Sequence, residues 1–340
     1  MGLRVVSVKH IVIGIAVGAT ALATLAGIAP FTDVAAATES SAEATTTTTP
    51  NPNPTPNPTP TPNPTPTPTP PAHRPRPPLV LQPAGLHNFA TTSRWVVLHR
   101  GSRVIRTLII TPKVTKGVIV PAIEFAHGWD SNPVVYINML RAWASTGCLV
   151  IAPRSPGMAR GSGLLSSSPA IARQIRDLPA VLTQVLAMKM NVVINRKEIA
   201  AAGHSDGGTS VATMAFNRGY SDRRIAAYLV LSGGTSPENS GPRHTDANTR
   251  PVFIADSYAD QFNNWPSAAT FFRQADGRKV LVGVGRGETH LTPWAVVTPF
   301  NERLWLATVD FVRWAATGTG AALTQMVKAL RLSGFGVNLD

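Results

Sequence analysis

The stretch Gly203-His204-Ser205-Asp206-Gly207 decides how this sequence is interpreted, because it fits the pattern G-x-S-x-G. The run 198–202 before it is short and mostly apolar, which predicts a buried strand. Residues 209–217 after it are typical of a helix. A serine at the apex of a strand-to-helix turn is held in a strained conformation with backbone close by, so small residues must flank it. The glycines on both sides of Ser205 meet this requirement.

Strand-like and helix-like runs alternate through the rest of the chain after residue 85. The predicted strands are 94–100, 104–111, 117–126, 148–153, 198–202, 225–231, 251–255 and 279–283, and the predicted helices are 134–146, 170–190, 209–217, 267–274 and 299–315. This alternation predicts an α/β fold with a mostly parallel central sheet and helices on both faces. We expect no large lid, although the irregular stretch 233–250 could cover one side of a cleft.

The amino-terminal part has the composition of an export signal followed by a spacer. Residues 1–37 contain two basic residues, an apolar stretch at 11–29 and small residues at 34–37, which predicts a cleaved signal peptide or a retained membrane anchor. Residues 38–84 form a linker, nearly all Pro, Thr and Asn from 45 to 78, which is typical of an extended disordered spacer. The catalytic domain is then 85–340, and we expect it to work outside the cytoplasm, extracellular or on the cell surface.

The charge and cysteine content exclude some functions. Lys and Arg outnumber Asp and Glu by 31 to 18, which gives a net charge of +13 and favours anionic surfaces or substrates. The basic residues occur singly or in pairs, so nucleic-acid binding is not expected. Cys148 is the only cysteine and begins an apolar run, so we interpret it as a buried strand residue without a disulfide.

A serine nucleophile needs a base, and the base needs an orienting acid. In a sheet of this kind the acid and the base follow the serine in that order along the chain. His290 lies just beyond the last predicted strand and is the candidate base, whereas His244 precedes the candidate acids. Two acids, Asp256 and Asp260, follow the strand 251–255, and both remain open on this argument.

Stabilisation of a developing oxyanion needs two backbone N–H groups. We assign one to Asp206, the residue after the serine, and the other to Trp129, because a His-Gly step at 127–128 lets the backbone approach a substrate closely. We interpret His127 as a residue that orients this loop. The aromatic residues Trp129, Trp265 and Trp294 lie in predicted loops near the site and are candidates for substrate binding.

Residues 85–335 resemble the α/β-hydrolase superfamily, and within it the branch of dienelactone hydrolase, chlorophyllase and the cutinase-like polyester hydrolases. The motifs that carry the resemblance are Phe125-Ala126-His127-Gly128-Trp129, Leu149-Val150-Ile151-Ala152-Pro153, Gly203-His204-Ser205-Asp206-Gly207-Gly208, Asp256-Ser257-Tyr258-Ala259-Asp260 and Gly287-Glu288-Thr289-His290. In the polyester-hydrolase relatives the acid closes a G-x-x-x-D-like loop. That spacing implies Asp260 as the acid, with Asp256 standing where those relatives carry glycine.

The resemblance and the motifs together predict a secreted serine hydrolase that cleaves carboxylic esters through an acyl-enzyme. Ser205, His290 and Asp260 form its triad, and neither a cofactor nor a metal is expected. The substrate is an ester, and a polymeric or surface-bound ester fits this prediction. The carboxylate of Asp206 either disfavours an anionic acyl group or is paired with a nearby arginine, and the sequence leaves both open. Two alternatives stay open: an amide or peptide hydrolase with the same triad, and a surface-tethered binding protein without activity.

Overall fold

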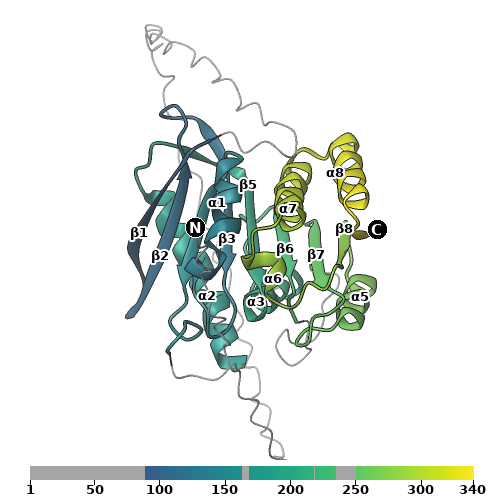
Figure 1. Ribbon diagram of the computed structural model, residues 1–340. Helices are drawn as coiled ribbons and strands as arrows, with labels where there is room; N and C mark the ends of the chain where they lie inside the picture. The colour runs from purple at the N-terminus through teal and green to yellow at the C-terminus, as the bar shows by residue number, and fades with distance from the viewer. Residues whose placement is uncertain (1–88, 163–167, 218, 235–249) are drawn as a thin grey trace, which may run out of the picture. The chain divides into compact units, whose positions relative to one another are not determined.

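A computed structural model of the protein describes residues 89–162, 168–217, 219–234 and 250–340 (Figure 1). The expected signal or anchor, the spacer and most of the stretch 233–250 lie outside these residues. Within the described part, no helix is both long enough and apolar enough to cross a membrane. All described residues belong to one compact unit, Pro71–Asp340.

The centre of this unit is a sheet of nine strands in the order β1-β2-β4-β3-β5-β6-β7-β8-β9. The six strands from β4 to β8 in this order run parallel, while β1, β2 and β9 are antiparallel to their neighbours. The strands are β1 Thr91–Arg100, β2 Arg103–Pro112, β3 Ile119–Ala126, β4 Leu149–Arg154, β5 Val193–His204, β6 Ala227–Leu231, β7 Val252–Ser257, β8 Lys279–Val284 and β9 Gly336–Leu339.

Helices cover both faces of the sheet, and each face has its own apolar core. The helices are α1 Ile137–Ser145, α2 Ser168–Ala187, α3 Asp206–Phe216, α5 Trp265–Gln274, α6 Thr292–Ala295, α7 Pro299–Thr317 and α8 Gly320–Leu332, with the 3-10 helix η1 Pro133–Tyr136 before α1. Helices α1, α6, α7 and α8 pack on one face, and α2, α3 and α5 on the other. Strand β5 serves both cores, since Ala200 and Ala202 face the first and Ile199 and Ala201 the second.

The prediction of an α/β fold with a mostly parallel sheet is confirmed. Three elements were not predicted, namely the four-residue helix α6, helix α8 and the short antiparallel edge strand β9. Helix α7 ends at Thr317 and is capped by Gly318, which adopts φ 71° and lets the chain turn directly into α8. The predicted helix 170–190 ends earlier, at Ala187, so residues 188–190 lie in the loop that follows it.

The register brings the carboxyl ends of the parallel strands to one level. Ala126 of β3 pairs with Gly203 of β5, and Leu231 of β6 pairs with Ala255 of β7. The segments that follow these strands therefore meet at one edge of the sheet. Sites in open α/β sheets lie at this edge.

Candidate active site

Ser205 is the single residue that connects β5 to α3, and its backbone is strained, with φ 58° and ψ −126°. The neighbouring glycines make this turn possible. A Cβ atom on Gly203 would lie 2.1 Å from the carbonyl oxygen of Gly207, and one on Gly207 would lie 2.1 Å from that of Ala126. Strain of this kind persists only where the surrounding structure enforces it, and it is concentrated at functional sites.

The loop after β3 lies directly against Ser205. A Cβ atom on Gly128 would come within 2.9 Å of the Cβ atom of Ser205, so this position requires glycine. His127 holds the loop: its Nδ1 donates to the carbonyl of Gly128 at 2.8 Å, and its Nε2 accepts from the N–H of Ser155 at 3.0 Å. Burial lowers the pKa of His127 to about 4, so the ring is neutral and acts through these two bonds.

The loop has a second support that the sequence did not reveal. The buried side chain of Gln174, on α2, donates from Nε2 to the carbonyl of His127 at 3.0 Å. Its Oε1 accepts from Ser210 of α3 at 2.7 Å. The only available signal was a polar residue beside Ile171, Ile175 and Leu178 on the apolar face of a helix.

The two predicted oxyanion donors lie on segments that touch Ser205. Asp206 is the first residue of α3, so its backbone N–H lies at the amino-terminal end of that helix. The positive end of the helix dipole also lies there. Trp129 follows Gly128, and its side chain is 43% exposed. A negatively charged oxygen above Ser205 would therefore sit in a favourable field.

His290, beyond β8, is hydrogen-bonded to Asp260, beyond β7. The distance between Nδ1 of His290 and Oδ2 of Asp260 is 2.7 Å, and both residues are buried. The imidazole lies beside the residue that precedes Ser205, since the rings of His204 and His290 are 4.6 Å apart between centroids. The structure thus brings the predicted base and acid together next to the Ser205 turn.

Asp260 is held in its ionised form by donors from its own loop. Its Oδ1 accepts from the N–H of Phe262 at 2.8 Å and from that of Asn263 at 2.9 Å. Burial by itself raises the pKa of Asp260, but these bonds and the one from His290 outweigh burial and lower the pKa below its ordinary value. A carboxylate in this state accepts the Nδ1–H of His290 and fixes the tautomer with Nε2 free of hydrogen.

Asp256 has the opposite character. It lies inside β7, where it pairs with Gly283, and its side chain is hydrogen-bonded to Asp260. Burial first, and then the charge of Asp260, raise the pKa of Asp256 well above its ordinary value. The neutral carboxyl of Asp256 therefore donates to Asp260, and it is Asp260 that accepts from His290.

A buried polar chain connects the base to the loop near the serine. Nε2 of His204 lies 2.9 Å from the carbonyl oxygen of His290, which can only accept, so His204 carries its hydrogen on Nε2. Its Nδ1 then accepts from the hydroxyl of Tyr136 at 2.8 Å, and Tyr136 in turn accepts from Ser131. Burial lowers the pKa of His204 to about 3, which keeps this arrangement neutral.

The aromatic residues differ from the prediction. Trp294 was expected to line the site, but its indole is fully buried in α6 and donates to the Ser232 hydroxyl at 3.1 Å, so this expectation is wrong. Trp265 is partly buried and packs edge-to-face on Tyr258 at 4.7 Å. Phe262, which the sequence analysis did not single out, is 72% exposed and lies 5.0 Å from the His290 ring.

Residues 90–235 match the family model of chlorophyllase, a family in the α/β-hydrolase superfamily. This range runs from β1 past the end of β6 and includes both Gly128 and Ser205. The chain has the α/β-hydrolase fold. The match supports, at a general level, a hydrolase that acts on esters. It ends before Asp260 and His290, so their roles depend on the geometry of the site.

The chain matches no curated protein. Within the described residues, no group of three His, Cys, Asp or Glu side chains is arranged to hold a metal ion. Cys148, the only cysteine, is buried and unoxidised beside Thr146.

Proposed function

We propose that this α/β-hydrolase is a secreted serine esterase that cleaves carboxylic esters through an acyl-enzyme. The observation that carries the proposal is the strained turn at Ser205 beside the hydrogen-bonded pair His290–Asp260. A serine on such a turn is presented to a substrate at the carboxyl edge of the sheet. A neutral imidazole oriented by an ionised carboxylate is the base that this serine needs.

In the first half of the reaction, Oγ of Ser205 attacks the ester carbonyl carbon while Nε2 of His290 takes the hydroxyl proton. The N–H groups of Asp206 and Trp129 stabilise the oxyanion of the tetrahedral intermediate. The intermediate collapses, the bond to the alkoxy oxygen breaks, and His290 gives its proton to the departing alcohol. Asp260 stays ionised throughout and stabilises the imidazolium.

In the second half, water attacks the acyl carbon of the ester on Ser205, and His290 takes a proton from this water. The bond to Oγ then breaks, His290 returns the proton to Ser205, and the carboxylic acid leaves. No group beyond these side chains and water is required for the balance of atoms and charge.

The surroundings of the site favour an apolar, uncharged acyl group. Trp129 and Phe262 present exposed aromatic surface beside Ser205 and His290, and such surfaces suit acyl chains and aromatic rings. Asp206 also adds an acidic residue directly after Ser205, in the first turn of α3, and a negative charge there would disfavour an acyl group that is itself negatively charged.

The direct test is Ser205→Ala, with Ser93→Ala on the exposed face of β1 as the matched control. We expect turnover of p-nitrophenyl esters to fall by several orders of magnitude in Ser205→Ala and to persist in the control. A fluorophosphonate probe should label the wild type and the control alone. If the probe still labels Ser205→Ala, the nucleophile is a residue other than Ser205.

The chemical class of the substrate needs a second assay. We expect p-nitrophenyl esters, in a series from acetate to palmitate, to be hydrolysed, and matched p-nitroanilides to be hydrolysed far more slowly. Faster cleavage of the anilides would replace the esterase by an amidase. Absence of turnover on both, with the fold intact, would favour a tethered binding protein.

We further propose that residues 45–78 act as a spacer that holds the domain away from a cell surface. At about 3.1 Å per residue such a segment extends to about 100 Å. Deleting it should leave kcat and KM on a soluble ester unchanged and lower the rate of intact cells on an insoluble ester. A loss on the soluble ester would contradict a spacer role.

A further inference from the structure

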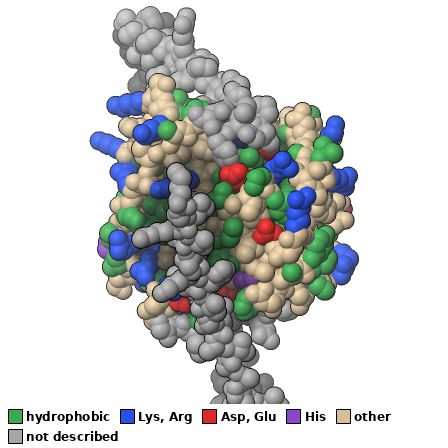
Figure 2. Space-filling view, viewed as in Figure 1, with side chains coloured by type: hydrophobic (Ala, Val, Ile, Leu, Met, Phe, Trp, Pro, Cys, Tyr) green, Lys and Arg blue, Asp and Glu red, His purple; other side chains and the backbone are tan. Residues whose placement is uncertain are grey.

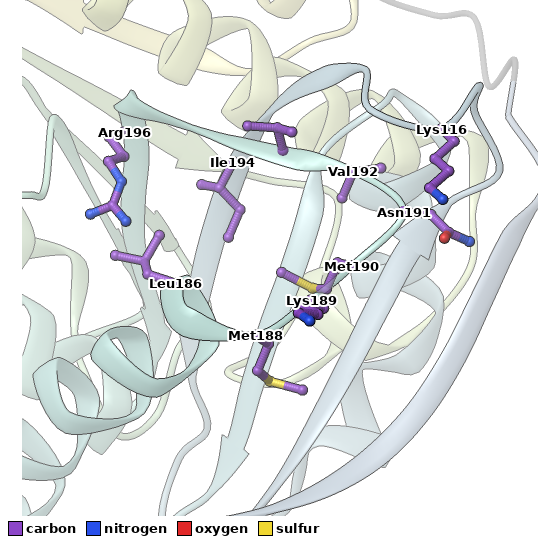
Figure 3. A pocket seen from close by; sticks show the side chains of 10 residues that line it. Lys116, Leu186, Met188, Lys189, Met190, Asn191, Val192, Ile194 and Arg196 are labelled. Atoms are coloured by element: carbon purple, nitrogen blue, oxygen red, sulfur yellow. The ribbon is translucent and has the colours of Figure 1, made fainter.

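A hollow, shown in Figure 3, lies at the end of the sheet where β5 begins, whereas Ser205 follows the end of β5. It is bordered by the end of α2, the loop that leads into β5 and the start of β5, together with Lys116 from the segment before β3. Strand β3 pairs with Val193 here through Ile119 and with Gly203 beside the site through Ala126, so seven steps of about 3.3 Å separate the two ends by roughly 23 Å. This hollow is independent of the proposed active site.

The hollow has the size of a small-molecule site. Its volume is about 540 Å³, within the range of about 300–1,000 Å³ for ligand pockets. The backbone that frames it is fixed, because the N–H of Gly117 donates to the carbonyl of Asn191 at 2.6 Å and that of Val193 to the carbonyl of Val118 at 2.9 Å. The backbone on two sides of the pocket is therefore held by hydrogen bonds within the chain.

The floor of the pocket is apolar and adaptable. Leu186, Met188, Met190 and Ile194 are half-buried: each packs against the core under α2 and leaves part of its side chain uncovered. Methionine is flexible and polarisable, so it adjusts to the shape of an apolar ligand. This surface fits an alkyl chain or an aromatic ring.

Three cations surround the apolar floor, and no acidic residue lines the pocket. Arg196 and Lys116 stand on opposite sides in Figure 3, and Lys189 lies between them beside Met190. None of the salt bridges between described residues involves these three side chains. An acidic group in the pocket would meet these charges without displacing an internal partner.

We infer that this pocket binds an anionic amphiphile. A phosphate or carboxylate head pairs with the cations, and the apolar part lies on the methionines, Leu186 and Ile194. The described chain begins at the same end of the sheet, where the carbonyl of Ala90 accepts from the N–H of Lys113 at 2.7 Å. An amphiphile bound in the pocket would leave the carboxyl edge of the sheet, where Ser205 lies, open to substrate. Its source is either a free molecule or a lipid in a bilayer, and the chemistry of recognition is the same.

The test compares three probes by calorimetry on the full chain: decyl phosphate below its micelle concentration, inorganic phosphate and decanol. We expect decyl phosphate to bind at least about tenfold more tightly than either of the others, since only it uses both halves of the pocket. Equal affinity for inorganic phosphate would contradict the apolar half of the proposal, and equal affinity for decanol would contradict the ionic half.

General attraction must be separated from binding in the pocket, because basic side chains are spread over the face seen in Figure 2. The pocket variant is Lys116→Gln, Lys189→Gln and Arg196→Gln combined. Its control removes the same charge at three exposed cations elsewhere, Arg94, Arg223 and Lys328, each replaced by Gln. We expect the pocket variant to bind decyl phosphate at least about tenfold more weakly and the control to bind like the wild type. Equal losses in both would overturn the proposal.

A vesicle arm identifies the source of the ligand. Vesicles with and without phosphatidylglycerol are mixed with the wild type and both triple variants. If only the pocket variant fails to bind the anionic vesicles, the pocket takes a lipid from the bilayer. If both variants bind them equally while decyl phosphate still distinguishes the two, the ligand is a free amphiphile. Turnover of a soluble ester should be the same in all three proteins, which verifies that they are folded.

Discussion

Asp260 and Glu124 are both buried carboxyl groups, but they occupy different regions of the sheet and carry different charges. Asp260 lies in a loop at the carboxyl edge, accepts three hydrogen bonds from N–H groups and is ionised. Glu124 lies in the middle of β3, where neither carboxyl oxygen has a hydrogen-bond partner among the described residues. Burial, and next the charge of Asp222, raise the pKa of Glu124 well above its ordinary value, although Arg224 acts the other way.

The difference follows from where backbone donors are available. Inside a parallel strand with neighbours on both sides, the backbone N–H groups are used in the ladder, so none is left for a side chain. At the carboxyl edge the ladder has ended, and the loop after Asp260 turns its N–H groups onto the carboxylate. The position of a residue along its strand therefore decides whether a buried acid can act as an anion.

The largest expected effect comes from neutralising the anion at the edge. Asp260→Asn should lower kcat on a soluble ester by about three to four orders of magnitude, because an amide cannot stabilise the imidazolium or fix its tautomer. Asp256→Asn should stay within about tenfold of the wild type, since an amide N–H can still donate to Asp260. Steady-state kinetics of the two variants measure this contrast.

The pair Asp256 and Asp260 also gives a pH-dependent readout. At alkaline pH the carboxyl of Asp256 loses its proton, and a second negative charge then faces Asp260. The Asp256→Asn variant should lack the corresponding change in the pH–rate profile. Equal losses of kcat in the two variants, or the reverse order, would contradict the assignment of Asp260 as the acid.

A smaller effect on kcat is expected from the buried polar chain that links Tyr136 and His204 to the carbonyl of His290. Tyr136→Phe removes the hydroxyl that donates to Nδ1 of His204, and a buried acceptor left without its donor costs about 1–3 kcal/mol. His204 then has no fixed tautomer with which to hold the carbonyl of His290. We expect kcat to fall about tenfold, with little change in KM.

The matched control for this network is Tyr228→Phe, which removes another buried tyrosine hydroxyl, from β6. Thermal unfolding should be measured for both variants alongside kinetics. If Tyr136→Phe lowers only the melting temperature and leaves kcat unchanged, Tyr136 is structural and does not position His290. The same conclusion would follow if Tyr228→Phe lowered kcat as much as Tyr136→Phe does.

The strained turn and the overall fold could be predicted from short-range patterns. The glycines around Ser205 and the alternation of apolar runs are local signals, and both gave the elements that carry the site. Helix α8 was not predicted. Strand β9 was missed because it has only four residues and pairs only at the edge of the sheet. A short edge strand has little pattern of its own.

The partners within the site could not be predicted in the same way, because they depend on contacts distant in sequence. The bond between Tyr136 and His204 joins residues 68 positions apart. Chain order alone left Asp256 and Asp260 equivalent, whereas the structure holds Asp256 in the ladder of β7 and places Asp260 in a loop free to reach His290. Trp294 was assigned to a surface because α6, a helix of four residues, has no visible signal in the sequence.

The smallest effect is expected from Glu124→Gln, which concerns stability and not turnover. A free glutamate has a pKa of about 4.3, and the native state raises this value, so the native state binds the proton more tightly than the unfolded chain. The stability that this group contributes is complete below about pH 4.3 and declines as the pH rises toward the raised pKa. Glutamine has nearly the same shape and does not titrate, so the variant should escape this decline.

The measurement is the melting temperature of wild type and Glu124→Gln between pH 5 and pH 9. The melting temperature of Glu124→Gln minus that of the wild type should increase by a few degrees between pH 5 and pH 9. A free-energy difference of about 1 kcal/mol corresponds to about 2–4 °C in a domain of this size. Glu198→Gln on β5 is the control, because that side chain is only half-buried and reaches water. Parallel curves for wild type and Glu124→Gln would mean that Glu124 is ionised and paired in the native state. The strand interior would then tolerate an anion as readily as the carboxyl edge does, and backbone donors would not be what separates the two regions.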